Sequence, residues 1–306
     1  MTSRSRTWSP GRPVPLGAIL GTSRRGPGDP TYRIGVGGDH WRGLRTPEGA
    51  VTLHLASRAV DGGVDATAWG DGAEWVLDRL PTMLGEEDDA AAFRPHHDFV
   101  IQALRHHPHW RVGASGLVMD ALVPAIIEQK VTGQEAFAGF RRLVRRYGEP
   151  APGPGADRDL WVAPAPETVR RVPSWEWLRM PVDPARSRTV VHACGRAAAL
   201  ERTVGDPREL ADRKLRSVPG IGVWTSAEVR YRAHGDADAL SVGDYHVAAN
   251  VGWTLVGEPF DDDRMVEELE VYRPHRYRVQ RLVELMGAYR PRRGPRMAPR
   301  RHLPGS

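Results

Sequence analysis

Alternation of apolar and polar residues marks the early part of the chain and predicts β-strands. Residues 51–56 and 64–69 both alternate with a period of two, within a longer strand-like region at 31–69. The Asp-Gly-Gly sequence at 61–63 lies between them and is typical of a hairpin turn. Together with the helical spacing that follows at 73–84 and 95–107, this pattern predicts a small antiparallel sheet with helices.

From about residue 116 onward, apolar residues recur at the spacing of an α-helix. Further helical patterns cover residues 185–200, 207–215, 223–234, 246–255, 262–271 and 275–289. A Pro/Gly-rich loop is expected at 149–158. The predicted protein is therefore mainly α with an N-terminal α+β part: residues 28–112 carry the sheet plus helices, and residues 113–289 form an all-helical core.

The two ends of the chain differ from this pattern. Residues 1–27 are rich in Ser, Arg, Gly and Pro without periodicity, which predicts a disordered basic N-terminus. Residues 290–306 form an Arg/Pro-rich tail. Its later arginines are Arg292, Arg293, Arg296, Arg300 and Arg301. This tail is interpreted either as a nucleic-acid tether or as a soluble terminus.

Composition limits the classes of protein that the chain can be. Of its 306 residues, 40% are hydrophobic and 26% charged, which is sufficient for a substantial core, and the formal net charge is +5. Cys194 is the only cysteine, so an internal disulfide and a cysteine-ligated iron–sulfur cluster are both excluded. No apolar run approaches the roughly 18–20 residues that span a bilayer. We therefore expect a cytoplasmic protein without a membrane partner, associated with the nucleoid if it is bacterial.

A Pro-Gly-Ile-Gly turn at 219–222 lies between two helical patterns. Asp206 and Pro207 are expected to begin the first helix as N-cap and N1 residues. Gly220 and Gly222 allow positive φ and close backbone approach, and the amides of the second helix face the turn. Such a turn can bind a phosphate through backbone amides alone. The alternative is an ordinary corner between two helices with a glycine cap.

A single carboxylate, Asp244, follows this hairpin and precedes another helical pattern. By itself it is interpreted as a helix N-cap. Its spacing of about 20 residues from the turn adds a second interpretation, because one helix out and one loop back return the chain to the same end of the helix pair. Asp244 could then face DNA beside the bound phosphate. The two roles are compatible, since a cap fixes the position of the carboxylate.

Residues 218–225, Val-Pro-Gly-Ile-Gly-Val-Trp-Thr, together with Asp244 resemble the helix-hairpin-helix, Gly/Pro-rich, aspartate (HhH-GPD) superfamily of DNA glycosylases. Within it the sequence is most similar to DNA-3-methyladenine glycosylase II. Trp224 stands where bifunctional relatives carry a Schiff-base lysine. Residues 126–131 resemble the family's helix that ends in Gln followed by a DNA-wedging residue, and residues 31–57 resemble its N-terminal sheet. The resemblance covers residues 28–289 and implies a core of two helical subdomains.

The resemblance implies a monofunctional glycosylase of base excision repair. Such an enzyme flips a damaged nucleotide out of double-stranded DNA and hydrolyses its N-glycosidic bond. By similarity, Asp244 stabilises the oxocarbenium-like sugar and assists the attacking water. Trp224 in place of lysine leaves no amine there for imine formation, so strand nicking is not expected. The partner is damaged duplex DNA, the protein is expected to be a monomer, and no cofactor is required.

The resemblance also implies roles for further residues. Trp224 and Tyr245 would be base-pocket aromatics, with core packing as the alternative. Gln129 and Lys130 occupy the wedge region, where Lys130 replaces an apolar residue and either fills the gap left by the flipped base or contacts phosphate. Glu228 replaces a family tyrosine, which makes the expected pocket less aromatic and more acidic.

The expected DNA-phosphate contacts are at Val218, Gly220, Ile221, Gly222 and Thr225. A structural Na⁺ or K⁺ could lie on the carbonyls of Arg216, Val218 and Ile221. The histidines at 96–97 and 106–109 are interpreted as a solvated helix face and its loop rather than as a metal site. Two other functions remain open: a glycosylase of the same superfamily for another lesion, and a non-catalytic helix-hairpin-helix protein that binds DNA or recognises lesions.

Overall fold

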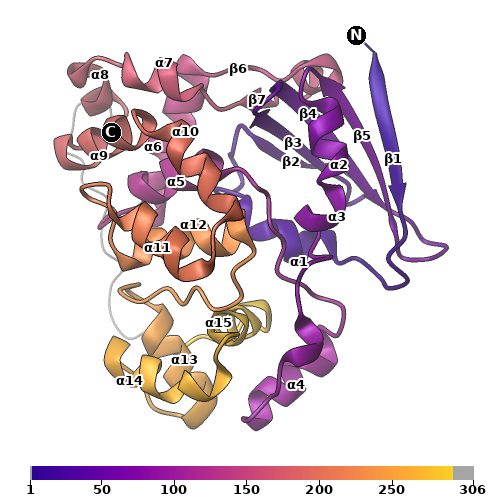
Figure 1. Ribbon diagram of the computed structural model, residues 1–306, viewed down its shortest axis with the longest axis vertical. Coiled ribbons are helices and arrows are strands. Elements are labelled where there is room, and N and C mark those ends of the chain that lie inside the picture. Colours follow the sequence, from indigo (N-terminus) through magenta and orange to yellow (C-terminus); the bar gives the residue numbers. More distant parts are fainter. Residues whose placement is uncertain (1, 292–306) are drawn as a thin grey trace.

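The computed structural model describes residues 2–291 and is mainly helical, with one antiparallel sheet built near the N-terminus (Figure 1). The sheet has five strands in the order β1-β5-β4-β3-β2. They are β1 (Ser3–Trp8), β2 (Tyr32–Ile34), β3 (His40–Thr46), β4 (Gly49–Ser57) and β5 (Val64–Gly70). The predicted fold class, mainly α with an N-terminal α+β part, is confirmed.

The central hairpin β4–β5 forms where alternation predicts it. Val51, Leu53 and Leu55 point to the buried face of the sheet, as the period of two requires. In the predicted turn, Asp61 Oδ1 accepts a hydrogen bond of 3.0 Å from the amide of Gly63. Helices α2 (Ala73–Asp78) and α3 (Leu80–Met83) follow in the chain, and their apolar side chains belong to the same core as the sheet.

The predicted disorder of residues 1–27 is wrong for the described residues. Strand β1 pairs antiparallel with β5 along its whole length, from Ser3 opposite Trp69 to Trp8 opposite Val64. Helix α1 (Leu16–Leu20) then buries three apolar side chains. An edge strand can be polar because water solvates one of its faces, so the Ser/Arg-rich composition concealed it. In the tail at 290–306, residues 292–306 and their arginines lie outside the described residues.

Most of the remaining helices fall in predicted helical segments. The remaining helices are α4 (Asp98–His106), α5 (Val118–Ile127), α6 (Gly133–Tyr147), α7 (Pro166–Arg170), α8 (Ser174–Arg179), α9 (Pro184–Cys194), α10 (Ala197–Glu201), α11 (Arg208–Arg216), α12 (Val223–Val229), α13 (Val247–Val256), α14 (Asp262–Glu268) and α15 (Arg276–Leu285). Helices α7 and α8 lie between the predicted loop at 149–158 and the helical pattern at 185–200. A π-helical turn, Arg230–His234, continues α12. Short 3₁₀ turns complete the chain.

Helix α12 lies between the two hydrophobic cores of the molecule. One core joins the sheet and α2–α4 to α13–α15, and the other is built mainly from α5, α6 and α8–α11 (Figure 1). Ala227 of α12 belongs to the first core and Val229 to the second. The intervening residue, Glu228, is therefore enclosed where the two helical groups meet.

The predicted loop at 149–158 contains regular structure. Strands β6 (Glu149–Pro150) and β7 (Trp161–Val162) form a two-stranded sheet around a 3₁₀ turn, Gly153–Arg158. This segment packs on the five-stranded sheet, where Leu160 and Val162 cover Trp41. The all-helical expectation for residues 113–289 is wrong here, because the segment's apolar residues find a partner that lies far away in the sequence. Over residues 2–291 no helix is both long and apolar enough to cross a membrane.

Candidate functional site

The hairpin predicted from the Pro-Gly-Ile-Gly turn is present between α11 and α12. Val218 and Ile221 are buried, and the amide of Ile221 donates to the carbonyl of Val218 at 3.0 Å. Gly220 has φ +90°, and a Cβ there would lie 2.2 Å from Thr189 Oγ1 of α9. A Cβ at Gly222 would meet nothing within 4 Å. Gly220 therefore lets the turn pack against α9, and Gly222 leaves the outer surface of the turn open.

Backbone donors are available on this open surface. In the described part of the chain, the amides of Gly222, Val223 and Trp224 have no hydrogen-bond acceptor, as expected at the start of a helix. Phosphate binding by this turn stays a prediction that the geometry permits. The predicted cap of α11 is wrong. The Asp206 carboxylate instead accepts from Lys214 Nζ at 2.7 and 2.9 Å, and α11 begins one residue later than expected, at Arg208.

Gln129 joins α5 to the hairpin. Its Nε2 donates to the carbonyl of Gly220 at 2.9 Å and to Thr225 Oγ1 at 2.8 Å. Thr225 is therefore a buried part of the hairpin support. The next residue, Lys130, is exposed with φ 54° and has no partner among the described residues. The structure thus brings Gln129 to the hairpin, whereas a wedge or phosphate role for Lys130 stays a prediction.

Asp244 lies against the hairpin with its carboxylate fixed at both oxygens. Oδ1 accepts the amides of His246 at 2.8 Å and Val247 at 3.2 Å, so it holds the chain at the start of α13, although the N-cap residue of that helix is His246 and not Asp244 as predicted. Oδ2 accepts the indole Nε1–H of Trp224 at 3.2 Å. The side chain is partly exposed, and no arginine pairs with it in the part of the chain that the structure describes. The predicted proximity of Asp244 to the hairpin is therefore confirmed.

Tyr245 is exposed beside Asp244, and a base-pocket role for it with Trp224 stays a prediction. Its side chain is 86% exposed and packs edge-on against the ring of His246, with 4.7 Å between ring centroids. The alternative of core packing is therefore wrong for Tyr245. The carboxylate of Asp244 faces Trp224, whereas the side chain of Tyr245, the next residue, points to solvent.

Glu228 is enclosed rather than open to a base. Its carboxylate accepts from Tyr231 Oη at 2.8 Å, from Arg232 at 2.7 Å and from Ser241 Oγ at 2.8 Å. Burial acts to raise the pKa of Glu228, but the charge of Arg232 and the three side-chain donors outweigh it and hold the pKa below its ordinary value. The expectation of an acidic, accessible pocket residue is wrong, because every contact of this carboxylate is internal.

Two aromatic residues near Glu228 were not identified from the sequence. Tyr231 and Tyr277 stack with 4.1 Å between centroids and 10° between their planes. They line a small cavity together with Arg232 and the 110–115 segment. Tyr231 lies less than one turn beyond Glu228 on the same helical pattern, so helical spacing could have indicated it. Tyr277 comes from α15, and no local signal connects it to this place.

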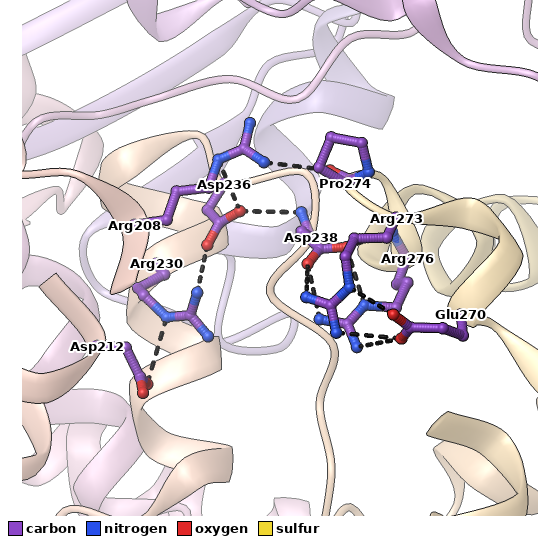
Figure 2. Close-up of polar contacts among 9 residues, drawn as sticks. All are labelled: Arg208, Asp212, Arg230, Asp236, Asp238, Glu270, Arg273, Pro274 and Arg276. Carbon is purple, nitrogen blue, oxygen red and sulfur yellow. Dashed lines mark hydrogen bonds and ion pairs between the residues drawn. The ribbon is translucent and has the colours of Figure 1, made fainter. Parts of the chain in front are cut away.

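The chain between the hairpin and Asp244 is held by paired charges. Asp236, whose side chain is 2% exposed, pairs with Arg230 and Arg208. Asp238 pairs with Arg276 Nη2 at 2.7 Å and with Arg273 of the segment before α15 (Figure 2). Figure 2 shows the two carboxylates side by side, each facing its own arginines. These pairs fix the start of the segment that leads to Asp244.

A second cavity, of about 180 Å³, lies beside Asp236 and is lined also by Asp206, Arg208 and His234. Neither of the two cavities is lined by Asp244 or Trp224. Among residues 2–291, no group of three or more His, Cys, Asp or Glu side chains could hold a metal ion. The monovalent cation expected on the carbonyls of Arg216, Val218 and Ile221 stays a prediction.

Comparison with known proteins identifies the fold. No protein-family model matches the chain, and no curated protein sequence matches it. The solved structure of a 3-methyladenine DNA glycosylase from Archaeoglobus fulgidus is similar with a TM-score of 0.74 and 19% identity, covering 91% of this chain and 97% of that chain. MBOgg1, solved with a low-affinity DNA ligand, has a TM-score of 0.69 and 11% identity, with coverages of 94% and 100%.

An 8-oxoguanine glycosylase/lyase from Clostridium acetobutylicum is similar with a TM-score of 0.65 and 10% identity, covering 93% of this chain and 96% of that chain. All three matches extend over nearly the full length of both chains. The chain therefore has the fold of the helix-hairpin-helix DNA glycosylases, as the sequence resemblance predicted.

Proposed function

We propose that this protein is a monofunctional DNA glycosylase of base excision repair, which hydrolyses the N-glycosidic bond of an alkylated, 3-methyladenine-type base in duplex DNA. The observation that carries the proposal is the contact between Asp244 and Trp224 beside the hairpin turn. It supports the proposal because it fixes a partly exposed carboxylate against a residue at the start of α12, whose free amides are suited to bind phosphate. The fold, which is that of known DNA glycosylases, supports the same conclusion.

Asp244 would act on the sugar of the flipped nucleotide. An alkylated purine carries positive charge and leaves readily, so the main need is to stabilise positive charge that develops on the sugar. Both oxygens of Asp244 already accept hydrogen bonds, from two amides and one indole, so the carboxylate needs no reorganisation during the reaction. We propose that the same carboxylate orients the attacking water.

The distribution of lysines supports hydrolysis rather than strand scission. Lys130 and Lys214 are the two lysines of the sequence. Lys214 of α11 pairs with Asp206, and Lys130 follows Gln129 beyond the end of α5. At the start of α12 the side chain facing Asp244 is an indole, which cannot form an imine.

The two other functions make different predictions. A non-catalytic DNA-binding protein would be favoured by an Asp244 buried in an arginine pair, and this carboxylate is instead partly exposed and bonded to Trp224. A glycosylase for oxidised bases is a second candidate, because the chain has the same fold as an 8-oxoguanine glycosylase/lyase. The two enzyme proposals differ only in the base that is released.

The test is a single-turnover base-release screen across methylated, deaminated and oxidised duplexes, with Asp244→Asn as the control. We expect release from methylated duplexes, and a loss of about 10²-fold or more in the Asp244→Asn variant with DNA affinity retained. Release of oxidised bases alone would replace the proposed substrate. A borohydride-trapped adduct would contradict hydrolysis, and DNA binding without release of any base would favour the non-catalytic alternative.

A further inference from the structure

We infer that Glu228 is a positioning residue, which holds the segment carrying Asp244 against the hairpin through Ser241. The inference rests on the proposed function, because it assumes that Asp244 is the catalytic carboxylate. It assigns to Glu228 a role apart from base recognition, and it adds Ser241 and Gln280 to the residues on which catalysis depends.

A short series of hydrogen bonds links α12 to the backbone of Asp244. Glu228 Oε1 accepts the hydroxyl of Ser241 at 2.8 Å. The carbonyl of Ser241 then accepts the amide of Asp244 at 3.2 Å. Ser241 is 1% exposed, so water does not compete for these bonds. A displacement of Glu228 would therefore be transmitted to the backbone of Asp244 through Ser241 alone.

Gln280 of α15 fixes Ser241 from the opposite side. Its Oε1 accepts the amide of Ser241 at 3.0 Å, and its Nε2 donates to Ser241 Oγ at 3.1 Å. The hydroxyl of Ser241 thus donates to Glu228 while it accepts from Gln280. Because amide, hydroxyl and carbonyl of Ser241 are all bonded, this residue has one orientation.

Glu228 is suited to this position because it accepts hydrogen bonds at both of its oxygens. Oε2 accepts hydrogen bonds from Tyr231 and Arg232, which leaves Oε1 to accept the hydroxyl of Ser241. The side chains of Glu228 and Arg232 are each 8% exposed, so each charge compensates the other in a buried place. A glutamine at 228 would remove the charge that pairs with Arg232 and would offer an N–H group where an acceptor is needed.

The result is that one helix holds the catalytic segment at two places. Trp224 contacts the carboxylate of Asp244, and Glu228, about one turn further along α12, holds its backbone through Ser241. The charge pairs of Asp236 and Asp238 fix only the start of the same segment (Figure 2). Small displacements of reacting groups are costly, so this second attachment should affect the chemical step more than DNA binding.

The main test is Ser241→Ala, which deletes one hydroxyl. Its matched control is Ser226→Ala. Ser226 lies on α12 and is also fully buried, and its hydroxyl donates to Asp212 at 2.7 Å, away from the Asp244 segment. Two quantities are measured: amide hydrogen exchange at 244, 246 and 247, and the single-turnover rate of base release with the dissociation constant for DNA. The three amides report directly on the bonds around Asp244.

We expect Ser241→Ala to raise exchange of these amides about tenfold and to lower the rate of release by about tenfold to 10²-fold, with DNA affinity unchanged. Ser226→Ala should match the wild type at these amides. Glu228→Gln should raise exchange at the same three amides, and the double variant should add little there, because both changes break the bond between Glu228 and Ser241. Should Glu228→Gln fail to fold, Ser241→Ala alone decides.

Unchanged exchange at the three amides in Ser241→Ala would overturn the inference. So would an equal increase throughout the hairpin, or weaker DNA binding with an unchanged rate. Should the wild-type protein release no base from any duplex, the proposed function fails, and hydrogen exchange still decides whether Glu228 and Ser241 hold the segment. The two failures are therefore distinguishable.

Discussion

Gly220 and Gly222 lie in the same turn, and the structure predicts different consequences when each is changed to alanine. At Gly220 the backbone has φ +90°, and a methyl group would lie 2.2 Å from Thr189 Oγ1 and 2.9 Å from its Cγ2. At Gly222 the backbone is extended, with φ −96°, and a methyl group would meet nothing within 4 Å. The first change should affect folding, and the second should affect the binding of DNA.

The magnitudes follow from these contacts. A non-glycine residue in the left-handed region costs about 1–2 kcal/mol, and overpacking against a buried side chain costs about 1–3 kcal/mol. We therefore expect Gly220→Ala to lower the free energy of unfolding by about 3 kcal/mol and the Tm by roughly 6–10 °C. Gly222→Ala should cost less than about 1 kcal/mol, as expected for a change at an N-cap.

The effect on DNA binding should fall on Gly222. Its methyl group would enter the open space at the turn, where we propose that a phosphate binds the free amides, and a lost hydrogen bond to a charged group is worth about 1.5–3 kcal/mol. Affinity for an undamaged duplex should therefore fall about tenfold or more. Thermal melting and fluorescence anisotropy at fixed salt measure the two effects separately.

A further variant separates the causes at Gly220. Thr189→Ala removes Oγ1 and Cγ2, the two atoms that a methyl group at residue 220 would clash with. The double variant with Gly220→Ala should therefore regain the stability lost to the clash. It should still lack the stability lost to backbone strain. The reasoning would be refuted if Gly220→Ala melted like the wild type. It would equally fail if Gly222→Ala lost stability without losing affinity for DNA.

Three further outcomes are expected. Trp224→Phe keeps an aromatic side chain but removes the donor to Asp244, so single-turnover base release should slow about fivefold with DNA affinity unchanged, and an unchanged rate would count against the contact. Gln129→Glu should lower the Tm more than Gln129→Ala, because a carboxylate would face the carbonyl oxygen of Gly220; equal melting temperatures would contradict this. Burial lowers the pKa of His234 from its ordinary 6.5 to about 4. As the pH falls through this range the unfolded state takes up the proton first, so up to roughly 3 kcal/mol of stability should be lost between about pH 6.5 and 4. His234→Gln should flatten this dependence in urea denaturation, and identical slopes would exclude His234 as its source.

Features set by neighbouring residues could be predicted from the sequence. The β4–β5 hairpin follows from local alternation around Asp-Gly-Gly, and the α11–α12 hairpin follows from a turn that few residue types can form. The proximity of Asp244 to Trp224 follows as well, because a single helix and a returning loop separate them. In each case the interacting residues lie within about one supersecondary unit.

Features set by distant partners could not be predicted. The polar sequence of β1 becomes a strand because β5 offers it an unpaired edge more than 50 residues later. The 149–162 segment folds because its apolar residues reach Trp41 on the sheet.

The sequence by itself determined the hairpin, the carboxylate beside it and the fold in which they lie. Tertiary structure alone decided what surrounds that carboxylate. Tyr245 follows Asp244 directly and is exposed, whereas Glu228 is buried and bonded to Ser241, 13 residues away. Gln280, which fixes Ser241, comes from a helix 39 residues further along. A local pattern specifies which face of a helix is apolar, but the partner of a buried polar group depends on how helices from distant parts of the chain pack together.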